Sequence, residues 1–173
     1  LFRSLQDAII GEYIPFLSRI FLENRIIQKP IRAIVRKGKE RFVCDSRLAQ
    51  RLEAVREKKK NAEQMKALLS LRDYYDLDAV TGLSGFDRRQ VCVPKVCEKS
   101  CSLRNICRYH QYLKEARSAE IFVQICNHNY LLADAAHRLQ EMRPLLNDYR
   151  ALVIDEAHKL PDAARQMYGQ SLS

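Results

Sequence analysis

The chain has 173 residues, enough for one domain with a substantial core or for parts of two domains. Its 47% hydrophobic and 29% charged residues are typical of a folded globular protein and exclude a disordered one. No apolar run approaches the roughly 18 residues that cross a bilayer, and no signal peptide is visible, so we expect no membrane partner. The net charge of +9 favours polyanions, of which nucleic acid is the commonest.

The N-terminal part predicts two helices and one strand. Helical spacing of apolar residues runs over residues 2–10 and stops at Gly11, and Pro15 opens a second helix. A short strand is predicted at residues 31–35, after which a basic loop leads to Phe42-Val-Cys44. The chain begins and stops in mid-pattern, so we expect it to be a segment of a longer one.

The middle part is predicted to be helical, without a comparable strand. A long charged helix is expected over residues 45–71, with Asp45 or Ser46 as its N-cap. The charge run at residues 57–60 on this helix is interpreted as a solvated face. Residues 73–90 lose periodicity and are predicted as loop or short turns, and residues 105–119 return to helical spacing.

The C-terminal part predicts alternating strands and helices. A strand at residues 121–126 is followed by a helix over residues 127–139, a second strand at residues 151–155 and a last helix after Pro161. Two buried strands separated by a helix are typical of a parallel sheet. The predicted fold class is therefore α/β and predominantly helical, with strands near residues 31–35, 121–126 and 151–155.

The segment Ala151-Leu-Val-Ile-Asp-Glu-Ala-His158 is the most informative motif. Four apolar residues indicate a buried central strand, and ligands of α/β sheets bind just beyond the carboxyl ends of such strands. Adjacent carboxylates at that position suit a divalent metal and an activated water, as an NTPase requires. The alternative is that Asp155 and Glu156 simply cap the following helix.

Six cysteines are more than an intracellular chain of this size usually carries. Four of them fall in the pattern Cys92-x4-Cys97-x3-Cys101-x5-Cys107, and Cys44 lies upstream. Clustered thiols suit an iron–sulfur cluster or a structural zinc ion, although the x5 gap is wide for zinc. Inert buried cysteines are the alternative, and we expect this packing role for Cys126 in its apolar strand.

Four motifs in order resemble one known family. They are Lys37-Gly-Lys-Glu-Arg-Phe-Val-Cys44, then Cys101-x5-Cys107 with Glu115-Ala-Arg117, then Asn127-His128-Asn-Tyr-Leu-Leu132, then Asp155-Glu-Ala-His158. In this order they look like the DinG branch of the XPD-type superfamily 2 DNA helicases. The resemblance covers essentially the whole chain. It implies ATP-driven translocation on single-stranded DNA, unwinding of duplex in repair or replication, and a P-loop parallel sheet.

The resemblance also implies a 4Fe–4S domain inserted into the first motor lobe, at residues 44–117 between lobe segments 1–43 and 118–173. Cys44 matches the first cluster ligand, and Cys101 and Cys107 match the last two. The family usually leaves four residues between the remaining ligand and the next. Here three residues separate Cys97 from Cys101 and eight separate Cys92 from it, so Cys97 is preferred over Cys92 as the closer match.

The resemblance assigns roles to the other motifs. Asp155 would hold Mg²⁺ through water, Glu156 would orient the attacking water, and His158 would link the nucleotide site to the second lobe. Asn127 and His128 match a motif beside the nucleic-acid path, although both could merely cap a helix. The sequence contains no Gly-x-x-x-x-Gly-Lys-Ser/Thr loop, so we expect this segment alone to be inactive towards ATP.

Basic and aromatic residues near the cysteines are candidate contacts to single-stranded DNA. The candidates are Arg36, Lys37, Lys39, Arg41, Arg104, Arg108 and Tyr109. Tyr74 and Tyr75 could stack bases or close the core. The resemblance further implies forked or flapped duplex DNA as a partner, a monomer, and a location in the bacterial cytoplasm on the nucleoid.

Two other functions remain open at this point. A zinc-stabilised nucleic-acid-binding module without a motor would use the same cysteines and basic charge, and a redox sensor would use the metal centre as a switch. We interpret residues 44–107 as thin in apolar content, so we expect their order to depend on the metal.

Overall fold

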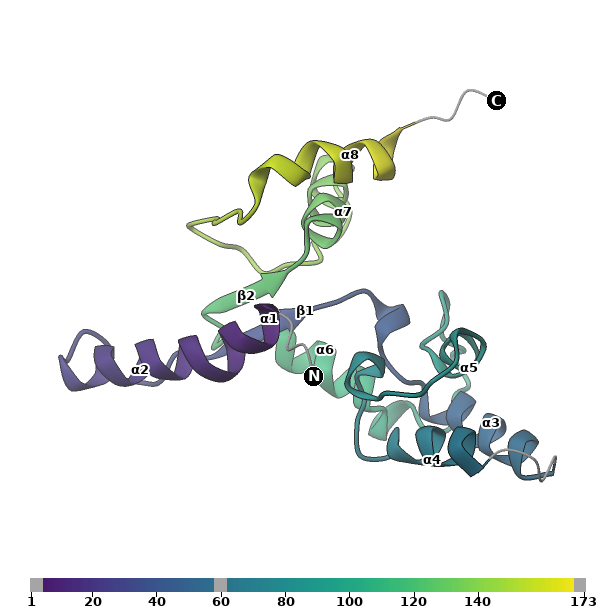
Figure 1. Ribbon diagram of the computed structural model, residues 1–173. Helices are drawn as coiled ribbons and strands as arrows, with labels where there is room; N and C mark the ends of the chain where they lie inside the picture. Colours follow the sequence, from purple (N-terminus) through teal and green to yellow (C-terminus); the bar gives the residue numbers. More distant parts are fainter. Residues whose placement is uncertain (1–4, 58–61, 170–173) are drawn as a thin grey trace. The chain divides into compact units, whose positions relative to one another are not determined.

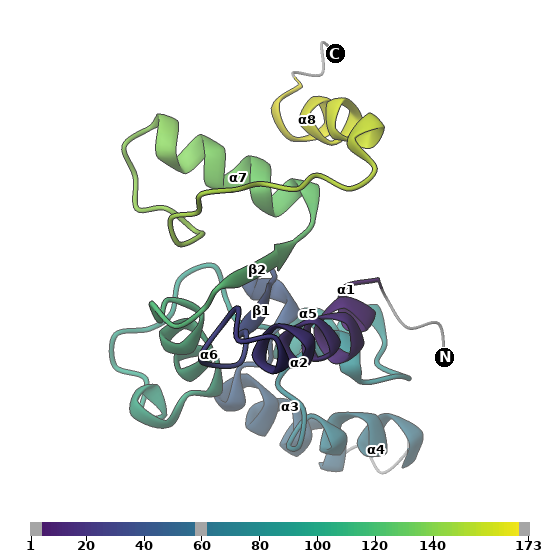
Figure 2. The same cartoon turned by 90° about the vertical axis from the view of Figure 1, so that its left-hand side faces the viewer.

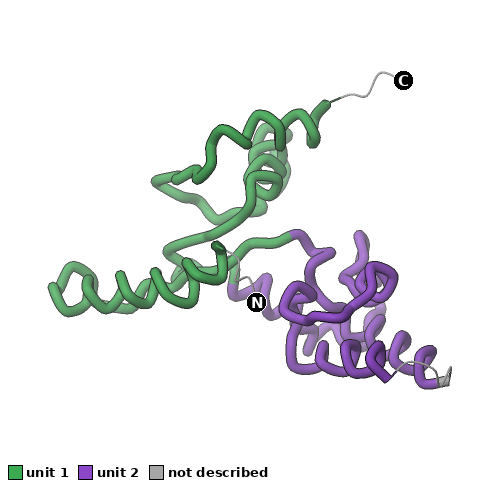
Figure 3. Tube along the Cα trace, in the orientation of Figure 1, with its two compact units in different colours: residues 1–37, 116–173 green, residues 38–115 purple. Residues whose placement is uncertain are grey.

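A computed structural model describes residues 5–57 and 62–169 (Figures 1 and 2). The chain divides into two compact units, which Figure 3 shows in different colours. Unit 1 consists of residues 1–37 and 116–173, and unit 2 of residues 38–115. None of the helices in the described ranges is both long and apolar enough to cross a bilayer. The predicted charge run lies, apart from Glu57, outside the described residues.

Unit 1 begins with a continuous helical run. It comprises α1 (Leu5–Ala8), a π-helical turn (Ile9–Tyr13) and α2 (Ile14–Glu23). The predicted stop at Gly11 is wrong, because Gly11 does not adopt the positive φ with which a glycine terminates a helix. Pro15 lies in the first turn of α2, where its missing N–H costs no hydrogen bond.

The sheet of unit 1 pairs strands that are distant in sequence. Strand β1 (Ala33–Arg36) runs parallel to β2 (Val123–Cys126), with Ala33 opposite Val123 and Arg36 opposite Cys126. These are the strands predicted near residues 31–35 and 121–126, and the prediction that both belong to a parallel sheet is confirmed. A parallel pair needs a long crossover connection, and here that connection contains all of unit 2.

The third predicted strand, at residues 151–155, is wrong. Residues 151–154 have no regular secondary structure, and no strand in the described parts of the chain pairs with them. Leu152 and Val153 are 50% and 91% exposed. An apolar run forms a strand only where a neighbouring strand takes up its backbone hydrogen bonds, which local hydrophobicity alone does not supply.

The rest of unit 1 consists of two helices in mutual contact, α7 (His128–Leu139) and α8 (Leu160–Tyr168). Both were predicted, and the side chain of Asn127 caps α7 by accepting a hydrogen bond from the backbone N–H of Tyr130 at 2.9 Å. Tyr168 donates its hydroxyl hydrogen to the carbonyl of Leu132, which fastens the end of α8 to α7.

Unit 2 is helical and has its own hydrophobic core. Its helices are α3 (Asp45–Glu57), α4 (Ala62–Ser70), α5 (Gly85–Val91) and most of α6 (Arg108–Ala116). Eight buried aliphatic side chains form the core: Val43, Leu48, Val55, Leu68, Leu71, Leu77, Val80 and Val91. Each such side chain stabilises the unit by roughly 1.5–3 kcal/mol. The expectation of thin apolar content is therefore wrong.

All of helix α5 except Val91, and a short 3₁₀ turn (Leu77–Ala79), lie within residues 73–90, so the prediction of loop or short turns is wrong where α5 forms. Ser84 caps α5, accepting a hydrogen bond from the backbone N–H of Asp87 at 3.0 Å. Strand-like pairing in unit 2 is limited, in the described residues, to isolated antiparallel bridges between Val43 and Cys92 and between Phe42 and Asp76.

Candidate functional site

The acidic segment of unit 1 is a tight, exposed turn. Glu156 has φ 48° and ψ 44°, the left-handed conformation, which costs a non-glycine residue on the order of 1–3 kcal/mol. Its backbone N–H donates to Asp155 Oδ1 at 2.9 Å, and its carboxylate accepts a hydrogen bond from Lys159. Strained turns of this kind concentrate at functional sites, so the geometry is consistent with a functional pair of carboxylates.

A second motif meets the acidic segment. The Nε2 atom of His128, at the start of α7, lies 3.0 Å from the carbonyl oxygen of Asp155. The structure thus brings together two motifs that are far apart in the sequence. Beside them is a polar pocket of about 400 Å³, lined by Asn127, His128, Asn129, Lys159, Asp162, Ala163 and Gln166.

The electrostatics of this turn favour an ionised Glu156. The hydrogen bond and charge of Lys159 lower the pKa of Glu156, and the nearby His158 and His128 lower it further. Glu156 therefore carries its negative charge at neutral pH, which is the state required of a residue that accepts a hydrogen bond from an attacking water.

The cysteines of unit 2 form the second candidate site. Cys44 follows the bridge residue Val43, and its backbone N–H donates to the carbonyl of Val91 at 2.8 Å. Burial raises the pKa of the Cys44 thiol; nearby backbone N–H groups oppose this, and Cys107 and Cys101 raise it further. Those two cysteines are therefore near enough for their charges to act on Cys44.

Cys92 and Cys97 differ in their surroundings. Cys92 packs against the hydrophobic core of unit 2, and Arg47 donates to its carbonyl at 2.8 Å. In an antiparallel bridge, paired residues share a face and successive residues alternate, so Cys92 lies on the face of Val43 and opposite to that of Cys44. Cys97 is exposed and is followed by a turn that leads to Cys101.

The cysteines have the donor chemistry of a thiolate-bound metal site, but they are not gathered into one. Cys44, Cys101 and Cys107 are half-buried soft donors, and Cys97 is solvent-accessible. Yet among the residues that the structure describes, no three Cys, His, Asp or Glu side chains are gathered closely enough to hold a metal ion. Cys126 belongs to β2 of unit 1, where it is half-buried, and burial raises the pKa of its thiol.

Most predicted DNA-contact residues lie at the surface of their unit, but one does not. Arg36 is only 1% exposed, so its prediction as a DNA contact is wrong. Arg104 is exposed, Lys37 is partly exposed, and Lys39 donates to the carbonyl of Lys95. Arg41 lies 3.4 Å from Asp78 in an exposed ion pair.

Arg108, a predicted DNA contact, is held by three partners within unit 2. Its guanidinium pairs with Asp45 and donates to the carbonyls of Arg72 and Leu71 at 3.0 and 2.9 Å. The arginine therefore fastens the start of α6 to the start of α3 and to the residues after α4. A role in DNA binding stays a prediction for this residue.

Four aromatic side chains gather in unit 2. The ring of Phe42 lies 4.4 Å from that of Tyr112, 5.3 Å from Tyr109 and 5.9 Å from Tyr75. Tyr75 is stacked on Phe42 and still 43% exposed, and its neighbour Tyr74 is 52% exposed. Tyr75 thus contributes to the packing while offering a face to solvent.

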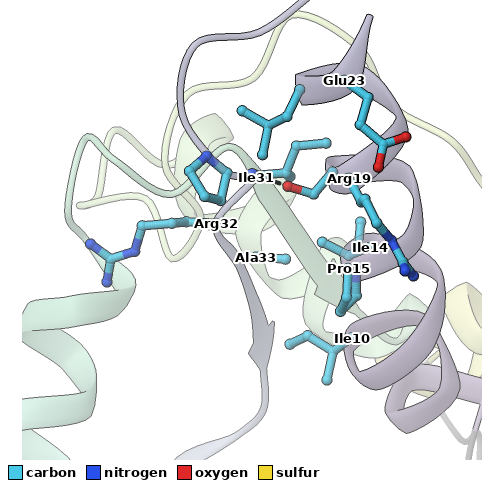
Figure 4. A pocket seen from close by; sticks show the side chains of 11 residues that line it. Ile10, Ile14, Pro15, Arg19, Glu23, Ile31, Arg32 and Ala33 are labelled. Carbon is cyan, nitrogen blue, oxygen red and sulfur yellow. Dashed lines mark hydrogen bonds between the residues drawn. The ribbon is translucent and has the colours of Figure 1, made fainter.

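A larger cavity of unit 1 is lined by a different set of residues. It has about 580 Å³ and is lined largely by apolar side chains of the π-helical turn, of α2 and of residues 30–33, among them Ile10, Ile14 and Ile31 (Figure 4). Arg19, Arg32 and Glu23 also line it. None of the predicted site residues contributes to this cavity, so it gives no support to the predicted chemistry.

Comparisons with known proteins point in one direction. No family model matches the chain. The chain is 36% identical over 73 residues to ATP-dependent DNA helicase YoaA of Escherichia coli K12, a match covering 42% of this chain and 11% of the relative. It is 38% identical over 60 residues to ATP-dependent DNA helicase YoaA of Haemophilus influenzae, covering 35% of the chain and 9% of the relative. The matches thus span about a tenth of the length of either relative.

Proposed function

We propose that this chain is a segment of an iron–sulfur-containing, ATP-dependent DNA helicase of the DinG and XPD-like type. The observation that carries the proposal is the partial similarity to two ATP-dependent DNA helicases. The contact between His128 and Asp155 supports it, since two motifs of the resemblance meet at that hydrogen bond.

The acidic turn would serve ATP hydrolysis in the longer protein. Asp155 would hold Mg²⁺ through water, and Glu156 would orient the water that attacks the terminal phosphate. The lowered pKa of Glu156 keeps it ionised, as that role requires. Lys159 occupies the Glu156 carboxylate here, so it would have to move aside or share the carboxylate when a water is bound.

In unit 2, Cys44, Cys97, Cys101 and Cys107 would hold a 4Fe–4S cluster. Such a cluster supplies a rigid cross-link and a one-electron redox centre. Cys97 suits the fourth position better than Cys92, because Cys92 lies on the core face whereas Cys97 is exposed and close in sequence to Cys101.

Unit 2 would also guide single-stranded DNA. Its residues include 17 Lys and Arg against 11 Asp and Glu, a net charge of +6 out of the +9 of the chain. A basic surface combined with exposed aromatic rings such as Tyr75 is the combination used for single strands, because phosphates bind the cations and bases stack on the rings.

The test uses the longer protein that contains this chain, purified without oxygen. We expect ATP hydrolysis stimulated by single-stranded DNA and unwinding of a forked duplex. Glu156→Gln should reduce the stimulated rate by about a hundredfold or more, since the positioned base is lost. Glu120→Gln is the matched control, because Glu120 is likewise an exposed carboxylate of unit 1 paired with a cation, Arg32. A protein without DNA-stimulated hydrolysis would overturn the proposal.

The same preparation tests the cluster and its ligands. Iron and acid-labile sulfide should be present, and the replacements Cys44→Ser, Cys97→Ser, Cys101→Ser and Cys107→Ser should each lower the iron content. Cys126→Ser should leave it unchanged. Iron loss in Cys92→Ser but not in Cys97→Ser would identify Cys92, and not Cys97, as the fourth ligand. A colourless protein with equimolar zinc would instead favour a zinc-stabilised nucleic-acid-binding module.

A further inference from the structure

A buried arginine joins three separate segments of unit 1. Arg36 is the last residue of β1. Its Nη1 atom donates to the carbonyl of Ala116 at 2.9 Å, and its Nη2 atom donates to the carbonyl of Leu145. The guanidinium also lies over the ring of Tyr130, 5.9 Å from its centroid. Among the described residues, Arg36 Nε is buried without a hydrogen-bond partner.

Asn147 also binds the carbonyl of Ala116. Its side-chain amide donates to Ala116 at 3.1 Å and lies 3.4 Å from the carbonyl of Ser118. Its backbone exchanges two hydrogen bonds with the side chain of Gln124 in β2, at 3.0 and 3.3 Å. The Ala116 carbonyl is therefore held from two sides, by β1 through Arg36 and by the loop that contains Asn147.

The same loop is tied to α7. The buried carboxylate of Asp134 accepts hydrogen bonds from the backbone N–H groups of Leu145 and Leu146, at 2.7 and 2.8 Å. Arg138 pairs with Asp134 at 2.8 Å and donates to the carbonyl of Leu146 at 3.1 Å. These hydrogen bonds place the loop firmly, and residues 148–154, which have no regular helix or strand, connect it to the acidic segment.

Arg36 and Ala116 lie next to the two points at which the chain passes between unit 1 and unit 2. The chain leaves unit 1 after Lys37 and returns to it at Ala116, so Arg36 and Ala116 lie at the two junctions of unit 2. The planar fork of an arginine binds two carbonyls at once only in one geometry. A displacement of either junction therefore breaks hydrogen bonds of Arg36 and removes one of the ties on the loop that precedes Asp155, which Asp134 and Gln124 also hold.

We propose that Arg36 and Asn147 are positioning residues that couple unit 2 to the acidic turn. Neither touches the acidic pair itself. They hold the loop before it in a place that depends on both junctions, so DNA bound at unit 2 alters ATP hydrolysis through them. This inference rests on the proposed helicase function, and it adds the route by which DNA would stimulate hydrolysis.

The test compares variants of the longer protein. Arg36→Lys retains the charge but loses the fork, and Asn147→Ala removes one of the two donors to Ala116 without burying a charge. We expect either variant to lower the stimulation of ATP hydrolysis by single-stranded DNA about tenfold. The rate without DNA and the KM for ATP should stay within about twofold of wild type. Arg32→Lys is the matched control, an exposed arginine just before β1, and should behave as wild type.

The outcomes separate this inference from the proposed function. A wild-type protein without DNA-stimulated hydrolysis refutes the helicase function itself. A stimulated wild type whose variants keep the same ratio refutes the coupling. An equal loss of the rates with and without DNA also refutes it, because it would show that the two residues merely fasten the fold. If Arg36→Lys does not fold, Asn147→Ala decides the question by the same ratio.

Discussion

The carboxylate of Asp87 holds three helices of unit 2 together. It is 1% exposed and accepts hydrogen bonds from Arg51 Nε at 2.7 Å, from Gln64 Nε2 at 2.8 and 3.1 Å, and from Ser84 Oγ at 2.7 Å. These partners belong to α3, to α4 and to the cap of α5. Replacing this one carboxylate should therefore weaken the whole unit.

We predict that Asp87→Asn lowers the free energy of unfolding of unit 2 by about 3 kcal/mol. The amide keeps the shape of the carboxylate but turns an N–H group towards donors, so at least one charge-assisted hydrogen bond is lost. Such bonds contribute roughly 1.5–3 kcal/mol, and breaking a buried ion pair costs about 3–5 kcal/mol. Arg51 keeps 19% side-chain exposure, so water partly compensates it and the lower end of the second range applies.

The assay is denaturant-dependent hydrogen exchange of backbone amides in the core of unit 2, such as those of Leu68 and Val91, in the intact chain. The matched control is Asp78→Asn, since Asp78 also pairs with two arginines but is 36% exposed at its side chain. Exposed pairs contribute about 0–1 kcal/mol, so the control should change little. The reasoning is refuted if both variants lose the same stability, or if Asp87→Asn loses less than about 1 kcal/mol.

Two further predictions concern the effect of pH and the effect of removing the metal. Burial opposes ionisation of Asp87, but hydrogen bonds from Ser84, Gln64 and Arg51 outweigh it and lower the pKa. The stabilisation by ionised Asp87 is therefore fully present above the pKa of about 3.9 that its carboxyl has in the unfolded chain, and it is lost as the pH falls through the lower pKa of the folded state. The free energies of unfolding of wild type and Asp87→Asn should converge at that pH. A constant difference between them down to about pH 2 would contradict this. Removing the metal from the longer protein should expose residues 94–107 to protease while the amides of α3 and α5 stay protected, and a collapse of protection throughout unit 2 would contradict that.

The sequence predicted those elements whose signals are local. The strands near residues 31–35 and 121–126 and the helix capped by Asn127 were found from apolar patterns and capping chemistry. Helix α5 was missed because it is too short for apolar periodicity to show. Its capping signal was nevertheless present, since Ser84 and Asp87 have the spacing at which a serine caps a helix and an acid follows three residues later.

Two errors show where local patterns mislead. Residues 151–154 are apolar enough for a strand, but pairing is a property of two segments and cannot be deduced from one. Arg36 was grouped with the basic loop that follows, although strand alternation places it on the same face as buried Ile34. The alternation was the better signal, because a long side chain at a strand end can turn inward when carbonyls are available to it.

Because unit 2 has a hydrophobic core of its own, a metal would have to stabilise only part of it. Its eight buried aliphatic residues come from residues 43–91, ahead of Cys97, Cys101 and Cys107. Residues 95–100 are all exposed, and the segment that follows contains only turns and a short 3₁₀ helix (Arg104–Ile106) before α6. The hydrophobic core therefore holds Cys44 in place without help, whereas the chain around Cys97 and Cys101 has little apolar packing of its own. A cluster bound by the proposed cysteines would fix this segment against an already folded body, so its loss should impair DNA guidance before it impairs folding.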